Sequence, residues 1–197
     1  MSEHTIKYDD GLVRCRWPGN DSQYIEYHDL EWGVPVFGDD ELFERISLEG
    51  FQAGLSWITI LRRREEFRKA FKNFKVAQVV KFDNSHVEKL MLNEGIIRNR
   101  AKIISTINNA QKIQELQKLG ISVSDLVWEF APKQKTLPAS RFEWRALSPE
   151  SEALSRELKK HGFGFVGPTT MYALMQATGL VNDHAPGCFR RKELAKS

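Results

Sequence analysis

The sequence lacks the features that mark secreted and membrane proteins. It has two cysteines in 197 residues, too few for a disulfide framework. No apolar run approaches the roughly 20 residues that a membrane-spanning helix needs. Residues 1–12 are polar and lack the apolar core of a signal peptide, so we interpret them as a flexible tail. We therefore expect a cytoplasmic protein with no membrane partner.

A strong excess of charge is also missing. The chain has 29 Lys and Arg against 26 Asp and Glu, a formal net charge of +3. This balance permits a polyanionic partner but does not require one. Basic residues gather in short groups at 62–64, 98–102, 156–161 and 190–192. Taken alone, each group is better explained by a solvated helix face.

No segment alternates apolar and polar residues strictly enough to predict a β-strand. Apolar residues recur instead at helical spacing, which predicts an all-α fold. Helices are expected at 23–31, 41–53, 58–71, 76–80, 86–92, 99–119, 122–130, 149–161 and 168–178. The apolar stripe of the long helix 99–119 is expected to consist of Ile103, Ile104, Ile107, Ile113 and Leu116.

Turn and capping residues divide these helices. The expected N-caps, whose side chains accept hydrogen bonds from the first helical turn, are Asp21 or Ser22, Asp39 or Asp40, Asp83 and Ser148. Two prolines in residues 131–147 indicate a loop that crosses between two helical lobes. We expect one domain over 13–190, followed by a short tail at 191–197.

The stretch 48–57 stands out within the helix 41–53 and its end. Glu49 lies among apolar residues, where a carboxylate is costly unless it is hydrogen-bonded or faces a cavity. Gly54 breaks the helix, and Trp57 follows directly. An acid, a glycine break and a large aromatic side chain in nine residues indicate the wall of a pocket.

Aromatic residues are concentrated in the first third of the chain. They are Trp17, Tyr24, Tyr27, Trp32 and Trp57. Such a cluster more often belongs to a core than to a ligand site. Its coincidence with Glu49 favours a ligand site.

A glycine-rich turn, Gly162-Phe-Gly-Phe-Val-Gly167, joins two expected helices. Its spacing matches that of a dinucleotide-binding loop, but a helix precedes it where that loop requires a strand. A second interpretation is a helix-hairpin-helix whose backbone amides at Gly162, Gly164 and Gly167 bind a nucleic-acid phosphate. A plain turn between helices fits equally well.

Two Cys and two His residues lie near opposite ends of the chain: Cys15, His28, His184 and Cys188. This set suits tetrahedral zinc, although the usual spacing of a zinc finger is absent. Spacing alone leaves open two unrelated buried thiols.

Taken together, these motifs resemble the 3-methyladenine DNA glycosylase I family. The resemblance covers about residues 13–190, without the loop at 131–147. It is carried by residues 15–17, 24–29, 31–35, 48–57, 95–102, 162–167 and 179–184.

The resemblance implies a helix-hairpin-helix glycosylase fold that hydrolyses the N-glycosidic bond of N3-methyladenine, flipped out of double-stranded DNA. It implies one structural zinc ion held by Cys15, His28, His184 and Cys188. It also implies that Glu49 is the catalytic carboxylate and accepts hydrogen bonds from the base, while Tyr24, Tyr27 and Trp57 surround the base. The three hairpin glycines are expected on the DNA backbone.

Further expectations concern roles that the sequence leaves unfilled. Asp183 directly precedes His184 and is not assigned as a general base, and no lysine is placed to form a Schiff base. We therefore expect a monofunctional, monomeric enzyme, with Gly54–Ser56 wedged into the gap left by the flipped base. The open alternatives are a non-catalytic relative that binds alkylated DNA, a zinc-dependent hydrolase and a helical adaptor. In use the enzyme would be associated with the nucleoid.

Overall fold

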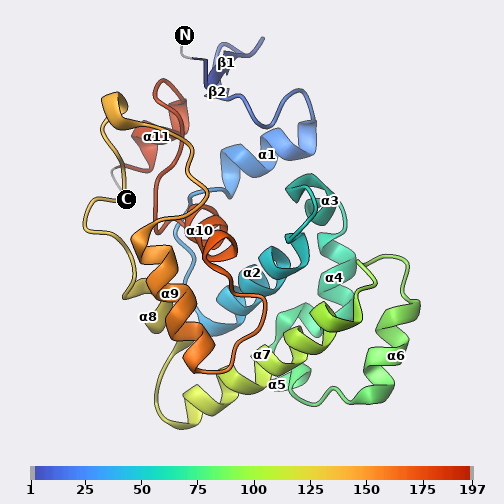
Figure 1. Ribbon diagram of the computed structural model, residues 1–197. Helices are drawn as coiled ribbons and strands as arrows, with labels where there is room; N and C mark the ends of the chain where they lie inside the picture. The colour runs from blue at the N-terminus through green and yellow to red at the C-terminus, as the bar shows by residue number, and fades with distance from the viewer. Residues whose placement is uncertain (1–2, 196–197) are drawn as a thin grey trace.

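The computed structural model describes residues 3–195 and is mostly helical, with long loops and one short strand pair (Figure 1). Its described helices are α1 Ser22–Leu30, α2 Asp39–Gln52, α3 Trp57–Leu61, α4 Arg64–Ala70, α5 Val76–Val79, α6 Asn84–Leu92, α7 Arg100–Lys118, α8 Val123–Trp128, α9 Pro149–Lys160, α10 Pro168–Ala177 and α11 Phe189–Glu193, with short 3-10 turns η1 Lys72–Phe74 and η2 Ala139–Arg141. None of these helices combines the length and apolar character needed to cross a membrane.

Helix α2 runs through the middle of the fold. It packs against both α7 and α10, and α9 packs on α10 in turn. Its apolar side chains are fully buried, among them Leu42, Phe43 and Phe51. The predicted stripe of α7 is buried except at Ile104, which is 49% exposed and was wrongly included. Ile104 lies on the outer side of α7, because α2 and the turn 162–167 pack on the neighbouring face.

Three of the predicted N-caps are confirmed. Asp21 accepts a hydrogen bond from the backbone N–H of Tyr24 at 2.9 Å. Asp83 caps α6 in the same way, and Ser148 forms a capping box with Ser151 at the start of α9. These signals are local, so the sequence alone identifies these three caps correctly.

The predicted caps of α2 are wrong. Gly38 precedes the helix, and neither Asp39 nor Asp40 caps it. Asp39 instead accepts a hydrogen bond from the N–H of Ser124 at 2.9 Å, at the start of α8. Asp40 accepts one from the N–H of Val76 at 2.8 Å, at the start of α5. The two carboxylates satisfy the free N–H groups of other helices that pack beside α2.

The N-terminal region also differs from the prediction. Strand β1 Thr5–Lys7 pairs antiparallel with β2 Val13–Cys15, with Thr5 opposite Cys15. Two three-residue strands are too short to produce a readable alternation, so the all-α prediction missed them. Within the expected tail 1–12, residues 3–12 therefore belong to this hairpin, and residues 1–2 lie outside the described part.

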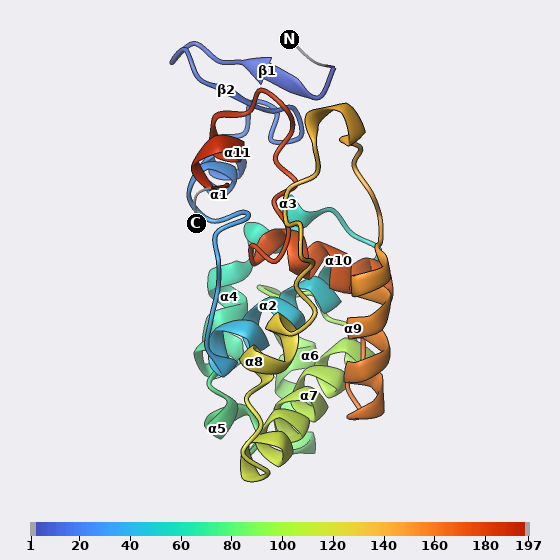
Figure 2. The ribbon, with the colours of Figure 1, turned by 90° about the vertical axis from the view of Figure 1, so that its left-hand side faces the viewer.

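The C-terminal segment is likewise more ordered than a tail. Helix α11 continues through residue 193, and the Arg191 guanidinium donates hydrogen bonds to the carbonyl groups of His184 and Leu137. Residues 196–197 lie outside the described part. The N-terminal hairpin, α1 and α11 lie together at one end of the molecule in both ribbon views (Figures 1 and 2).

The segment 131–147 is a loop apart from the turn η2, as predicted. It leaves α8, passes beside α11 and returns to α9 (Figure 1). The His4 ring contacts the Trp144 ring at 4.9 Å between centroids, so this loop also packs on the N-terminal region.

Candidate functional site

A cavity of about 310 Å³ lies between α1, α2, α10 and the loop 131–147. It is lined by Trp17, Tyr24, Tyr27, Trp32, Glu49, Gln52, Trp57, Trp144, Arg145, Ala173 and Gln176. All four residues predicted to bind a ligand, and both other aromatic residues singled out in the sequence, are therefore on its wall. The cavity has the mixed aromatic and polar lining of a small-molecule site.

Glu49 is the acidic residue of this cavity. Its side chain is on the third turn of α2 and the residue is 4% exposed. Its Oε2 atom has no hydrogen-bond partner within residues 3–195. Burial raises the pKa of Glu49 to about 8, and the positive charge of Arg45 opposes that rise. Arg45 precedes Glu49 by one turn of α2.

The aromatic side chains form a continuous wall beside Glu49. The Tyr27 and Trp57 rings lie 5.4 Å apart between centroids, and the Tyr24 and Tyr27 rings lie 6.4 Å apart. The Nε1 atom of Trp57 is buried without an acceptor in the described chain. Burial, and next the charge of Glu49, raises the pKa of Tyr24 to about 12 and that of Tyr27 well above 10. Both phenols are therefore neutral donors at physiological pH.

Five wall residues were not predicted: Gln52, Trp144, Arg145, Ala173 and Gln176. Gln52 lies three residues after Glu49 on the same helix face, and that spacing could have identified it. Trp144 and Arg145 come from the loop 131–147, whose sequence has no periodic pattern. Ala173 and Gln176 come from α10 and carry no signal in the sequence.

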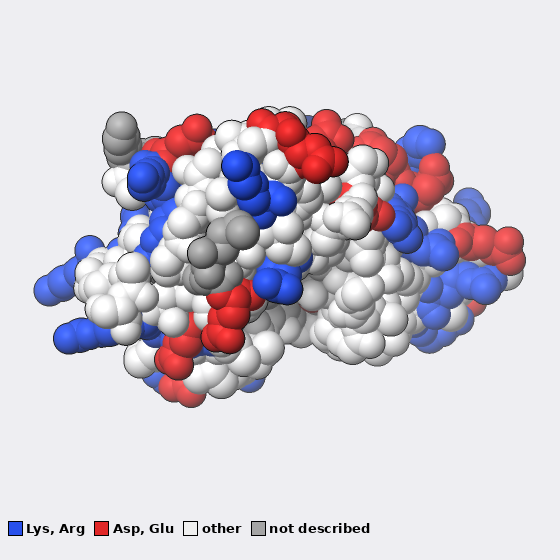
Figure 3. Space-filling model, turned by 90° about the horizontal axis from the view of Figure 1, so that it is seen from above, with Lys and Arg blue, Asp and Glu red and all other residues white. Residues whose placement is uncertain are grey.

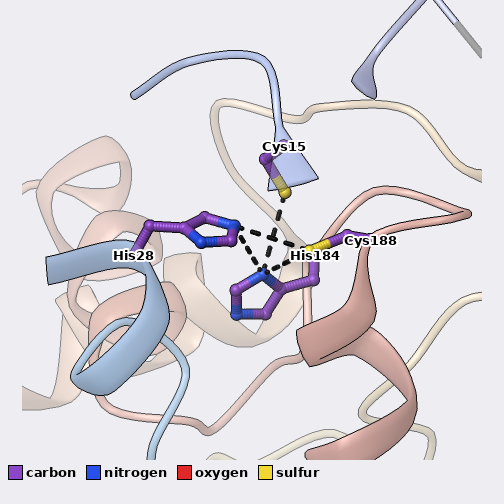
Figure 4. A group of neighbouring side chains, drawn as sticks. All are labelled: Cys15, His28, His184 and Cys188. Carbon is purple, nitrogen blue, oxygen red and sulfur yellow. Dashed lines mark hydrogen bonds between the residues drawn. The ribbon is translucent and has the colours of Figure 1, made fainter. Parts of the chain in front are cut away.

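Cys15, His28, His184 and Cys188 meet in a buried cluster (Figure 4). Their ligand atoms all lie within 4.8 Å of one another. Nδ1 of His184 is 3.2 Å from Nε2 of His28 and 3.5 Å from Sγ of Cys188. A tetrahedral metal ion with bonds of about 2.0–2.3 Å separates its ligand atoms by roughly 3.3–3.8 Å. The cluster could therefore hold a metal ion without large movement.

The outward nitrogens of both imidazoles are also engaged. Nδ1 of His28 lies 2.7 Å from a carboxylate oxygen of Asp29, and Nε2 of His184 lies 3.0 Å from the carbonyl oxygen of Trp32. Each acceptor favours a proton on the outer nitrogen, which leaves the inner nitrogen free to bind a metal. Burial lowers the pKa of His184, which further favours the neutral ring.

The cluster and the cavity share a wall. The Trp17 ring lies 5.3 Å from the His28 ring, and the Trp32 ring lies 4.6 Å from the His184 ring. Trp17 and Trp32 also line the cavity. The cluster therefore fixes the rear of the aromatic wall through residues distant in sequence.

The glycine turn 162–167 has fewer free amides than its sequence suggests. The N–H of Gly162 donates to the carbonyl of Lys159, and the N–H of Gly164 donates to Oδ1 of Asn109 at 2.8 Å. Gly167, Thr169 and Thr170, at the start of α10, have N–H groups that find no acceptor in the described chain. Of the three predicted glycines, only Gly167 offers its N–H to an external anion.

The turn after α2 is held by Lys102 of α7. Its ammonium group donates to the carbonyl oxygens of Phe51 and Ala53, at 3.0 and 2.6 Å. Gly54 follows with φ +85°, a conformation that favours glycine. Leu55 is exposed at the tip of this turn. Gly54–Ser56 lies between Gln52 and Trp57, which both line the cavity, and its role as a wedge stays a prediction.

Comparison with known proteins identifies a family. Residues 17–191 match Methyladenine glycosylase. The chain is 44% identical to "DNA-3-methyladenine glycosylase" of Haemophilus influenzae and 46% identical to "DNA-3-methyladenine glycosylase 1" of Escherichia coli, over 89% and 90% of this chain and 96% of each relative. The fold also resembles a solved structure of 3-methyladenine DNA glycosylase I from Staphylococcus aureus, described as the structural basis of 3-methyladenine recognition. The TM-score is 0.84 and the sequence identity 31%, and the match covers 90% of this chain and 96% of that one.

Proposed function

The chain belongs to the methyladenine glycosylase family, and we propose that the cavity around Glu49 is where it binds and excises 3-methyladenine. It acts as a DNA-3-methyladenine glycosylase, an enzyme that removes alkylated bases in base excision repair. We take residues 13–190 as one catalytic domain of two lobes. The observation that carries the site assignment is the buried Glu49 carboxylate at the wall of an aromatic cavity, whose Oε2 atom has no hydrogen-bond partner within residues 3–195.

The cavity suits a cationic base. N3-methyladenine in DNA carries a positive charge, and aromatic faces attract cations by about 0.5–2 kcal/mol per contact. Tyr27 and Trp57 would stack on the base, with Tyr24 beside them. Glu49 would accept hydrogen bonds from the base, and its ionised form gains stability when a cation enters. Neutral adenine gains neither contribution, so the same contacts provide selectivity.

The reaction breaks the bond between the sugar C1′ and the ring nitrogen of the base. The bonding electrons leave with the base and neutralise its positive charge. Water adds to C1′ and loses a proton to solvent. Because the alkylated base is already a good leaving group, little acid catalysis is needed. Glu49 contributes as the catalytic carboxylate, since its negative charge stabilises the electron-poor sugar and base of the transition state.

Two contacts support a monofunctional mechanism without Asp183 as base. Oδ2 of Asp183 accepts hydrogen bonds from the Tyr172 hydroxyl at 2.6 Å and from Gln176 at 2.9 Å. Asp183 is therefore committed to the structure behind the cavity. No lysine is among the residues that line the cavity in the described chain, so a Schiff base with the sugar is not expected.

Zinc is the metal that best suits the Cys15, His28, His184 and Cys188 cluster. Two thiolates and two imidazoles at tetrahedral separations are typical of structural zinc. Four protein ligands leave no position for an activated water, so the ion would stabilise the fold alone. By holding residues 15–28 against residues 184–188, it would keep the aromatic wall in place.

Double-stranded DNA would approach the face that carries the turn after α2 and the start of α10. Gly54–Ser56 would occupy the gap left by the flipped base. Gly167 and the N-terminus of α10 would receive a backbone phosphate. Over the end of the molecule formed by the N-terminal hairpin, α1 and α11, basic and acidic side chains are intermixed on the described surface (Figure 3). We expect a monomer to bind DNA through the face that carries Gly54–Ser56 and the start of α10.

Chromatographic identification of the bases released from methylated DNA tests the activity. Wild-type protein should release 3-methyladenine, and Glu49→Gln should release far less while still binding the DNA. Binding without release by the wild type would favour a non-catalytic relative. A coordination measurement that finds an exchangeable water on the metal would favour a zinc-dependent hydrolase. Binding that changes little with salt would favour a protein adaptor, because phosphate contacts weaken steeply as salt rises.

A further inference from the structure

Arg45 is held beside the cavity by a chain of ion pairs. Its Nη2 atom lies 3.1 Å from Oε2 of Glu31, just after α1. Arg64 of α4 binds both oxygens of the same carboxylate, at 2.6 and 2.7 Å. Nη1 of Arg45 is buried and forms no hydrogen bond with any described residue. Glu31 is thus shared between two guanidinium groups, and Arg45 keeps one side of its charge unneutralised.

That charge acts on Glu49, which follows one turn later on α2. The surroundings of Glu49 contain few other ionisable groups. Tyr24 and Tyr27 of α1 are neutral phenols, and Arg145 from the loop 131–147 lies across the cavity against the Tyr172 ring at 5.7 Å. Among the described residues, the positive charge of Arg45 opposes the rise that burial causes in the pKa of Glu49.

The remaining elements packed around the cavity add little. On α10, Gln176 is uncharged, and Asp183 beyond it is bonded to Tyr172 and Gln176. Arg64 is bound to Glu31 through two hydrogen bonds. The contacts therefore separate two roles. Arg64 binds both oxygens of Glu31, whereas Arg45 binds Glu31 through Nη2 and lies four residues before Glu49 on α2, at a spacing that makes side chains neighbours on a helix.

We propose that Arg45 is a positioning residue for base excision, which supports the ionised form of Glu49 and is itself held in place by Glu31 and Arg64. This inference rests on the proposed function of the cavity. Arg45 does not line the cavity, so its effect must pass through Glu49.

The charge balance explains why such a residue would matter. With Glu49 ionised, the two guanidinium groups and the two carboxylates of Arg45, Arg64, Glu31 and Glu49 sum to zero. With Glu49 protonated, the same four groups carry one positive charge. A cationic base would then be repelled from a cavity that otherwise accepts it. Arg45 lowers the pH at which Glu49 ionises, and it therefore extends the range in which the cavity receives a cation.

A titration of the Glu49 carboxyl carbon by NMR tests this inference without relying on activity. Arg45→Met should raise the titration midpoint by about one pH unit. Arg45→Lys keeps a positive charge and should restore most of the difference. Arg64→Met, the matched control, breaks its own bonds to Glu31 but leaves Arg45, and should move the midpoint less than half as far. An unchanged midpoint in folded Arg45→Met overturns the proposal.

The pH dependence of single-turnover base release gives the functional readout. In Arg45→Met the pH at which the release rate begins to fall on the acidic side should rise by about one pH unit. Below the midpoint the release rate should then be about tenfold lower than in the wild type, and at high pH it should approach the wild-type rate. Arg45→Lys should restore the profile. An equal loss at every pH assigns Arg45 a purely structural role and overturns the proposal. If wild-type protein releases no base, the proposed function fails, while the NMR titration still decides whether Arg45 controls Glu49.

Discussion

The ammonium group of Lys102 lies 2.6 Å from the carbonyl oxygen of Ala53, 49 residues earlier in the chain. Through this contact α7 closes the end of α2, the helix that carries Glu49. A cation at a helix C-terminus satisfies carbonyl groups that have no partner in the helix and interacts favourably with the helix dipole. The position of the turn after α2 thus depends on a residue of another helix.

Replacing Lys102 by Met should therefore destabilise the protein by about 1–3 kcal/mol, because two buried carbonyl groups lose a charged donor. Chemical denaturation measures the difference. Lys112→Met is the matched control, since Lys112 is on the same helix and pairs with Glu115 at the surface. Its effect should stay within about 0.5 kcal/mol. Equal stability of the two variants would contradict the capping role of Lys102.

Glu49 should make stability depend on pH. Its pKa in the folded protein is raised from 4.5 to about 8 by burial, so the folded state binds the proton more tightly than the unfolded state. This contribution is complete below pH 4.5 and is lost as the pH rises towards 8. Glu49→Gln does not titrate at this position. Relative to that variant, the free energy of unfolding of the wild type should fall by on the order of 3–5 kcal/mol between pH 4.5 and pH 8.5. Denaturation of both proteins at several pH values measures this; a constant difference would count against it.

Asp29 should influence metal binding although it is not a ligand. Its carboxylate is 2.7 Å from Nδ1 of His28, and Asp29→Asn should weaken metal affinity about 10–100-fold. Competition with a chelator measures this change. Asp10→Asn provides a matched control, because Asp10 binds the same Arg14 as Asp29 and makes no hydrogen bond with His28. The prediction is refuted if both variants bind metal alike.

Asn109 should position the glycine turn. Its side-chain amide accepts from the N–H of Gly164 and donates to the carbonyl of the same residue, at 2.8 and 3.1 Å. Asn109→Ala should lower the free energy of unfolding by about 1–3 kcal/mol. It should also weaken binding to methylated DNA more than binding to free 3-methyladenine. Fluorescence anisotropy and tryptophan quenching measure the two affinities.

Asn108→Ala is the control for this test. Asn108 makes one exposed hydrogen bond, to the carbonyl of Gly162 at 2.9 Å. We expect it to have a smaller effect on both affinities. If Asn109→Ala weakens the two ligands equally, the turn does not contribute to DNA binding separately from the cavity.

What could be predicted from the sequence is mostly local. The N-caps Asp21, Asp83 and Ser148 act within three residues, and the sequence identifies them directly. Glu49 was identified because a carboxylate on an apolar helix face violates the pattern around it. Gly54 was identified as a helix break, and its positive φ explains the choice of residue.

The contacts that escaped prediction join distant segments. Asp39 has the composition of a cap for its own helix, yet it serves α8, 85 residues later. The two strands are only three residues each, so their pairing leaves no periodic signal. Trp144 and Arg145 reach the cavity from a loop without any pattern. Such relationships are set by packing in three dimensions, and a one-dimensional pattern does not contain them.

The cluster of Cys15, His28, His184 and Cys188 can be completed only late in synthesis. Cys15 and His28 leave the ribosome long before His184 and Cys188 do, yet all four belong to one cluster. More than 150 residues separate His28 from His184. While these residues are synthesised, Trp17 and Trp32 have no contact with the C-terminal half of the cluster. A nascent chain that has not yet reached Cys188 therefore lacks the complete cluster behind the aromatic wall.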